Sequence, residues 1–257
     1  MELRPRDQFA WDCDADFLLA HPTLKRISLC GAEITCSTAG LPKRTTALLE
    51  LVLLCCDFSS ITLASILSAP RSLRRLTIKG SPRNLPYPRY LLVDAPPYIA
   101  EMKAHRSSLE LIDFDLFNIT ESSGLLLDFR PFTALQHLVI RPEVLYGTTL
   151  PNLPLEDCSL PPTLNKLTFW WNSFPISSWY QRNVARDINR WKTQGHLPGL
   201  RHLAFETPLP ARRRHRSLEA KLLVTWGQLK EISFFPSQCW CCEYHLSAQG
   251  RGSFWSV

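Results

Sequence analysis

Residues 72–80 read SLRRLTIKG, and residues 199–206 read GLRHLAFE. Both contain one phrase, Leu-x-x-(Leu/Ile)-x-(Leu/Ile/Phe), in which apolar residues follow the leading leucine after three and five positions. The phrase occurs at quasi-regular spacing along the chain, with leading residues Leu24, Leu48, Leu73, Leu109, Leu135, Leu164, Leu200 and Leu229. Neighbouring leading leucines are 24 to 36 residues apart, with a mean of about 29 residues, which indicates a repeat architecture.

The phrase itself predicts a short β-strand. Alternate residues of a strand point to opposite faces, so the residues three and five positions after each leading leucine face one common core. Between the phrases we expect helices over residues 16–20, 61–68, 99–105, 184–193 and 218–226. In the fourth of these, Val184, Ile188 and Trp191 have the spacing of one helix face. Because strands and helices alternate, the prediction is an α/β solenoid with a curved parallel sheet on its concave side and helices and loops on its convex side.

Composition agrees with many short elements. The chain of 257 residues has 20 prolines and only 10 glycines, a balance that disfavours long uninterrupted sheets and glycine-rich phosphate loops. Pro22, Pro70, Pro162 and Pro198 each lie just before a leading leucine, where proline favours an extended entry into a strand. We therefore predict one domain over residues 1–235, built from about eight irregular repeats. Residues 236–257 do not continue the phrase and form an atypical C-terminal tail.

The phrases at 72–80 and 199–206 resemble the leucine-rich repeat family. The long, irregular repeats with prolines before the strands are most similar to the substrate-binding regions of F-box proteins, particularly fungal ones. This resemblance implies a non-catalytic protein-binding scaffold that recognises substrates for a ubiquitin ligase. The position eight residues after each leading leucine is often asparagine or cysteine in the family, but only Cys56 and Asn172 fit here.

A second departure concerns the F-box itself, a helical module of about 40–50 residues that normally precedes the repeats. Only some twenty residues precede Leu24, so we expect this chain alone not to dock the Skp adaptor of a cullin complex. The expected partner is a protein bound on the concave face by a monomer.

The strand positions two, four and six residues after each leading leucine should line that concave face, the usual binding surface of a solenoid. Arginine and tryptophan are enriched among residues that dominate binding energy, and Arg75, Lys79, Arg141, Lys166 and Trp170 make a candidate patch. The complete set of candidate protein-binding residues is Arg26, Glu50, Arg75, Lys79, His137, Arg141, Lys166, Trp170, His202 and Glu231. The first position is charged or histidine in seven of eight repeats, so we expect this row to be solvated.

The alternative is a nucleic-acid-associated or nuclear protein that uses a basic run near the C-terminus and the basic residues of the concave face. The net charge is +6, and a basic run on a loop comprises Arg212, Arg213, Arg214, His215 and Arg216. The acidic residues Asp113 and Asp115 interrupt the basic residues of the concave face, however, which argues against a continuous phosphate-tracking stripe. Protein binding is therefore the favoured hypothesis.

Catalysis, metals and membranes are disfavoured. The sequence has no GxSxG, Walker-type, GxGxxG or HExxH motif, so we expect no enzyme and no cofactor. Cys239, Cys241, Cys242 and His245 are zinc-type ligands on one segment, whereas structural zinc sites usually take two spaced pairs. Without a signal peptide or a spanning apolar run, the expected location is cytoplasmic or nuclear.

Overall fold

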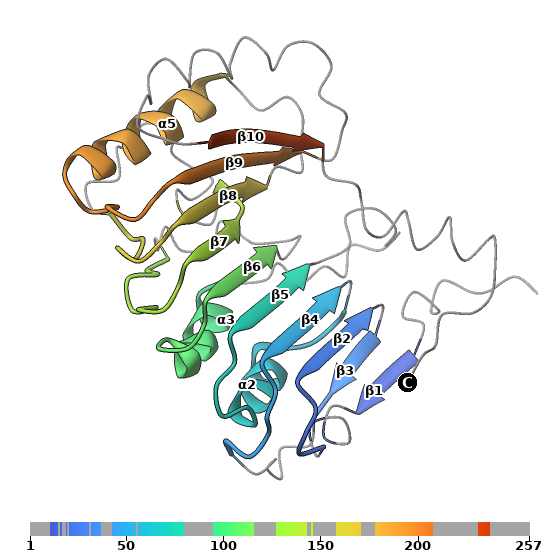
Figure 1. The fold of residues 1–257 in the computed structure, drawn as a ribbon. Coiled ribbons are helices and arrows are strands. Elements are labelled where there is room, and N and C mark those ends of the chain that lie inside the picture. Colours follow the sequence, from blue (N-terminus) through green and yellow to red (C-terminus); the bar gives the residue numbers. More distant parts are fainter. Residues whose placement is uncertain are drawn as a thin grey trace, which may run out of the picture.

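A computed structural model describes residues 11–14, 16, 19, 21–30, 32–36, 43–54, 56–79, 95–115, 127–142, 145, 158–170, 178–207 and 231–236. Within these residues the fold is α/β: one large parallel sheet with helices on one of its faces, as predicted (Figure 1). The strands of the large sheet are β2 (Arg26–Cys30), β4 (Glu50–Leu54), β5 (Arg75–Lys79), β6 (Leu111–Asp115), β7 (His137–Ile140), β8 (Lys166–Trp170), β9 (His202–Thr207) and β10 (Glu231–Pro236). Each of the eight phrases thus ends in a strand that begins two residues after its leading leucine.

The eight strands are hydrogen-bonded in chain order, from β2 at one edge to β10 at the other, and every ladder is parallel. The register never shifts: Arg26 pairs with Glu50, Glu50 with Arg75, and the same position is matched across all later ladders. A slip by one residue would move every apolar side chain to the other face. The constant register therefore keeps one face apolar across the whole sheet.

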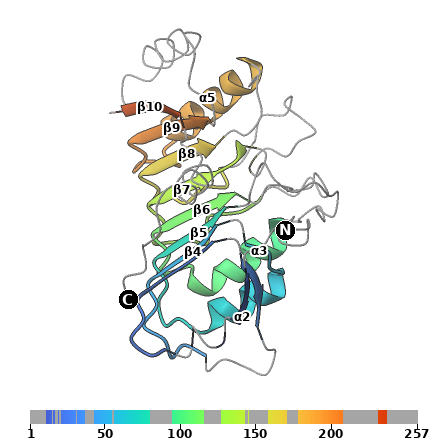
Figure 2. The same cartoon turned by 90° about the vertical axis from the view of Figure 1, so that its right-hand side faces the viewer.

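The core lies between that apolar face and the helices. Residues three and five positions after the leading leucines are buried in every strand from β2 to β8, and Phe114 and Phe169 have no exposed surface. The helices are α2 (Ser60–Ser68), α3 (Ala95–Met102), the short 3₁₀ helix η1 (Lys103–His105) and α5 (Ser178–Thr193). Figure 2 shows them on the same side of the sheet, and among the described residues no helix covers the opposite face, which is called the open face below. On α5 the predicted face of Val184, Ile188 and Trp191 is buried, which confirms the periodicity argument.

Local chemistry explains where the helices begin. Ser59 caps α2, its hydroxyl accepting a hydrogen bond from the Thr62 amide at 3.0 Å. The helix expected over 99–105 begins earlier, at Ala95, because Pro96 and Pro97 occupy its first turn, where their missing amide protons are not needed. The helix expected over 184–193 begins at Ser178. Of residues 16–20, residues 16 and 19 are helical, and residues 218–226 lie outside the described residues.

One part of the fold was not expected. Strands β1 (Trp11–Asp14) and β3 (Ala32–Thr35) form a separate two-stranded parallel sheet, which lies on the helix side of β2 (Figures 1 and 2). In β3, Ala32 and Ile34 are buried while Glu33 and Thr35 are exposed, the alternation of a half-buried strand. This pair of strands covers the edge of the core beside β2.

Candidate functional site

The open face of the large sheet carries most of the candidate residues in one row. Because the register is constant, residues two positions after each leading leucine stand side by side across adjacent strands, about 4.8 Å apart. The row is Arg26, Glu50, Arg75, Leu111, His137, Lys166, His202 and Glu231. The side chain of Glu231 lies outside the description, so the row can be followed in detail from β2 to β9.

Three further candidate residues meet at the other end of the strands. Asp115 lies between Lys79, its partner in the β5–β6 ladder, and Arg141, the residue that follows β7. The Arg141 Nε donates a hydrogen bond to Asp115 Oδ1, and its guanidinium carbon lies 5.4 Å from the centre of the Trp170 ring. This geometry is a cation–π contact added to a charge-assisted hydrogen bond. The structure thus brings Lys79, Arg141 and Trp170 together around a carboxylate.

Three of the basic candidate residues form ion pairs with acidic neighbours. Lys79 Nζ lies 2.9 Å from Asp113 Oδ2, and the two side chains are 24% and 15% exposed. Arg141 and Asp115 are 13% and 4% exposed. Near the edge, Arg26 and Glu50 form a pair at 2.7 Å, but Arg26 is 67% exposed. The open face therefore changes from solvated ion pairs at β2 to partly desolvated ones at β6 and β7.

Burial shifts the titration of two groups there. Loss of solvent raises the pKa of Asp115, while the charges of Arg141 and Lys79 and the hydrogen bond from Arg141 act in the opposite direction. Loss of solvent also lowers the pKa of His137 to about 4, assisted by the positive charges of Lys166 and Lys79. The imidazole of His137 is therefore neutral at physiological pH, with its Nε2 3.3 Å from the Thr168 hydroxyl.

No residue of this row whose side chain is described is buried, as expected for a solvated row, but the positions four residues after the leading leucines differ. Arg26 and Arg75 are exposed, but Thr168 is fully buried and Ala204 nearly so. Thr168 pairs with Val139 on one side and Ala204 on the other, and Lys166 and Trp170 flank it on the same strand. The small side chains of Thr168 and Ala204 therefore lie among larger neighbours midway along β8 and β9.

Sequence reasoning noticed Asp113 and Asp115 but not that they pair with Lys79 and Arg141. It also missed a set of arginines in the turns that precede the strands. The signal was present: Arg44, Arg71 and Arg106 each lie two to four residues before a leading leucine. The basic run from Arg212 to Arg216 and the cysteine cluster near Cys239 lie outside the described residues.

The described residues contain neither a candidate metal site nor a candidate membrane-spanning helix. No group of three or more His, Cys, Asp or Glu side chains there could hold a metal ion, and no helix among them is long and apolar enough to cross a bilayer. Comparison of the chain with models of protein families, with curated proteins and with solved structures finds no match.

Proposed function

We propose that the chain is a leucine-rich repeat solenoid that acts as a non-catalytic scaffold, binding a partner protein on the open face of its sheet. The observation that carries the proposal is the unbroken register of eight parallel strands, each beginning two residues after the leading leucine of a repeated phrase. In the part of the chain that the structure describes, this stacking leaves one extended face free of helices, and solenoids bind partners on surfaces of this kind.

The centre of the proposed binding surface is the group of Arg141, Trp170 and Asp115. Binding energy concentrates in a few aromatic and arginine side chains that are well packed and partly shielded from water. Trp170 is held by the Arg141 guanidinium, which is itself fixed by Asp115. A tryptophan held in this way loses little conformational entropy on binding, so it supports recognition of an apolar or aromatic side chain of the partner.

Substrate recognition for a ubiquitin ligase, the narrower form of the proposal, rests on the resemblance to F-box proteins alone. Nucleic-acid binding on the same face is less well supported, because Lys79 and Arg141 are paired with Asp113 and Asp115. A phosphate backbone would have to compete with those carboxylates for the same cations.

Site-specific photo-crosslinking tests the proposal. A photoreactive phenylalanine derivative replaces Trp170 on the open face or, as the matched control, Ile61, which is 68% exposed on α2. We expect one discrete protein adduct from position 170 and none of that species from position 61. Adducts from position 61 alone, or none from position 170, contradict binding on the open face.

The partner identified in this way permits a quantitative check. Trp170→Ser should raise its Kd about thirtyfold, the equivalent of about 2 kcal/mol for a residue that dominates binding. Arg186→Ala, a change on the exposed side of α5, should leave the Kd unchanged. We also expect that a purified Skp adaptor does not bind this chain, because no F-box pattern precedes its repeated phrases; stoichiometric binding would contradict this expectation.

A further inference from the structure

Three turns, which lead into the neighbouring strands β4, β5 and β6, lie side by side at the amino-terminal ends of these strands. They comprise residues 44–49, 69–75 and 103–109, one from each of three successive repeats. The Arg44 amide donates to the Ser68 carbonyl at 2.9 Å, and the Arg71 amide donates to the Thr46 carbonyl at 3.1 Å. The Leu73 amide in turn donates to Nδ1 of the buried His105 at 3.4 Å. These bonds fix the three turns against one another.

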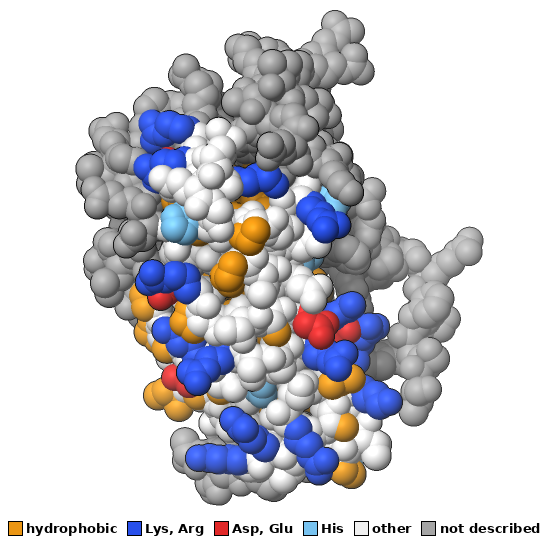
Figure 3. Space-filling model, turned by 60° about the vertical axis from the view of Figure 1, so that its left-hand side comes forward, with side chains coloured by type: hydrophobic (Ala, Val, Ile, Leu, Met, Phe, Trp, Pro, Cys, Tyr) orange, Lys and Arg blue, Asp and Glu red, His pale blue; other side chains and the backbone are white. Residues whose placement is uncertain are grey.

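The turns carry a strong excess of positive charge. They contain Arg44, Arg71, Arg74, Arg75, Lys103 and Arg106 but no aspartate or glutamate, and all six cationic side chains are exposed. Among the described residues, the ion pair found for them joins Arg74 to Glu110 at 3.7 Å. Figure 3 turns the amino-terminal ends of the strands toward the viewer. On this side of the molecule lysine and arginine side chains outnumber acidic ones.

The positive charge of the turns contributes to the pKa shifts of two neighbouring groups, His105 and Asp128. The positive charge of Arg44 contributes to lowering the pKa of His105, after the larger effect of burial. The charge of Lys103 contributes to lowering the pKa of Asp128, after the larger effect of its hydrogen bond with Arg130. Both effects have the sign expected of the positive charge on these turns, and the acidic groups found near them are Glu110 beside Arg74 and Asp128 near Lys103.

The composition of the turns selects the kind of ligand. Five of the six cations are arginines, whose planar guanidinium binds carboxylate or phosphate in a bidentate manner. The three segments contain no Phe, Tyr or Trp, whereas single-stranded nucleic acids are held by stacking on such rings as well as by charge. Three adjacent turns span about 10 Å, close to the spacing of two or three same-side residues of an extended peptide.

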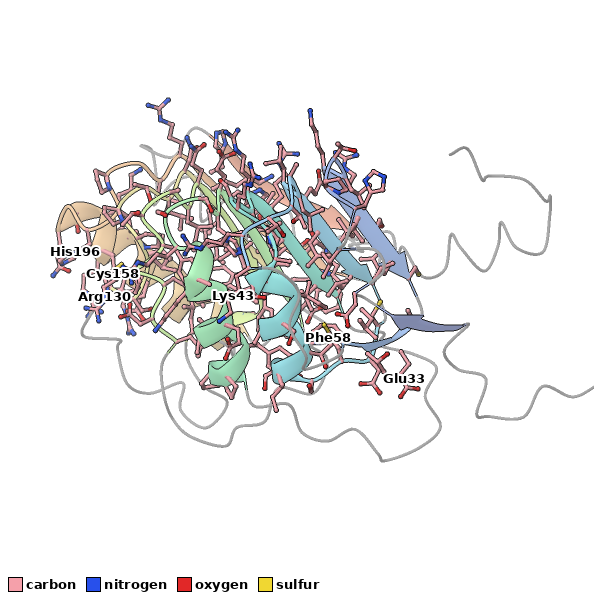
Figure 4. All side chains as sticks on the ribbon, turned by 90° about the horizontal axis from the view of Figure 1, so that it is seen from below. Glu33, Lys43, Phe58, Arg130, Cys158 and His196 are labelled. Carbon is pink, nitrogen blue, oxygen red and sulfur yellow. The ribbon has the colours of Figure 1, made fainter. Side chains whose placement is uncertain are left out.

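We propose that the three turns form a second interaction surface, which meets the open face only at Arg75 and binds an extended protein segment rich in carboxylate or phosphate groups. Figure 4, seen from below, shows the separation of the helix side from the open face of the sheet. The proposal does not require that the open face binds anything. Its ligand is held by charge-assisted hydrogen bonds from guanidinium groups at the beginnings of the strands.

The test uses the full chain and a fluorescently labelled oligoglutamate peptide, with binding measured by fluorescence anisotropy. Arg44→Gln, Arg71→Gln and Arg106→Gln are combined in one variant, none of them a residue of the open face. The matched control combines Arg130→Gln, Arg186→Gln and Arg201→Gln, which removes the same charge from exposed positions elsewhere. We expect the Kd to rise about tenfold in the first variant and much less in the control. Raising the ionic strength should weaken binding of the unmodified chain.

Three further results decide the outcome. A variant that combines Arg44→Lys, Arg71→Lys and Arg106→Lys keeps the charge but loses the bidentate guanidinium groups. Its Kd should lie between that of the unmodified chain and that of the glutamine variant, which separates charge from any effect on folding. Equal losses in the first variant and the control overturn the proposal, since net charge alone would then explain binding. Tighter binding of a labelled oligouridylate than of oligoglutamate, lost in the same variant, overturns the assignment to an acidic protein segment in favour of RNA.

Discussion

The pair formed by Arg141 and Asp115 offers the sharpest test of the open face, through Arg141→Ala. The Asp115 side chain is only 4% exposed, so removing Arg141 leaves a carboxylate in a poorly solvated position with less compensating charge. Breaking a buried pair in this way typically costs about 3–5 kcal/mol of folding stability. The matched change is Arg26→Ala, which breaks a pair whose arginine is 67% exposed and should cost about 0.2–1 kcal/mol.

Urea denaturation followed by circular dichroism measures the free energy of unfolding of both variants. In a thermal melt of a chain of this size, Arg141→Ala should lower the Tm by roughly 6 to 20 °C. The pKa of Asp115 is already raised in the folded state, so the folded chain binds this proton more tightly than the unfolded chain. The stability associated with the protonated carboxyl is present at low pH and is lost as the pH rises through the folded pKa.

The coupling between the protonation of Asp115 and folding makes the effect of the substitution depend on pH. Arg141→Ala should raise the pKa of Asp115 further, so the loss of folding stability in this variant should shrink as the pH falls from neutral toward acidic values. Replacing the pair with Met at 141 and Leu at 115 should restore most of the loss, because well-packed apolar residues often substitute for a buried ion pair. Equal costs below about 1 kcal/mol for Arg141→Ala and Arg26→Ala would refute the inference that Asp115 is a desolvated carboxylate held by Arg141.

Three other changes test the fold. Phe114→Ala removes a ring without exposed surface and should cost about 3–5 kcal/mol in urea denaturation, against less than about 0.5 kcal/mol for the exposed Ile61→Ala; similar costs would contradict the placement of the core. The pKa of His105 is lowered in the folded state, so its contribution to stability is lost as the pH falls below about 6.5 toward the folded pKa. His105→Gln should flatten that acid-side loss in a series of thermal melts, and an unchanged slope would count against it. Gly199→Ala would place a Cβ 3.2 Å from two backbone carbonyl oxygens and should destabilise by about 1–3 kcal/mol; a neutral effect in the same melts would show that this approach is not tight.

The repeated phrase predicted the sheet almost completely. Each leading leucine is followed by apolar residues at a period of two, and a helix cannot bury such a pattern on one face. This is why the positions of Leu76 and Ile78, and their equivalents in the other strands, could be assigned to the core before the structure was known. Pairing of the strands in chain order also followed, because each repeat can bury its apolar face only against its neighbours.

Other features depend on information that a short sequence window does not contain. Strand β3 has four residues and its partner β1 is more than fifteen residues away in sequence, so neither carries the repeated phrase. The helix predicted over residues 99–105 begins earlier, at Ala95, because the first turn of α3 tolerates Pro96 and Pro97. In both cases the local sequence pattern does not specify the position of the residues within the fold, and that position determines the structure.

The ion pairs of the open face could be predicted only in part. The constant register places Asp115 directly between Lys79 and Arg141, so an attraction among the three could be predicted from the strand assignments. The structure instead joins Lys79 to Asp113, the diagonal neighbour on β6, at 2.9 Å, and leaves Asp115 as the hydrogen-bond partner of Arg141. Diagonal pairs are within reach of long side chains, and their selection depends on rotamers that the strand pattern does not specify.

The change in burial across the open face has a consequence for the proposed scaffold. Exposed charges such as Arg75 at the β2–β5 end act on an approaching partner through long-range, salt-screened fields, which mainly affect the association rate. The partly buried group around Trp170 acts only after water has been displaced, and truncating such a residue mainly raises the dissociation rate. Stopped-flow measurements on Arg75→Gln and Trp170→Ser would separate the two effects. Because a single register brings both ends onto one face, a partner can be attracted by one part of the sheet and discriminated by the other.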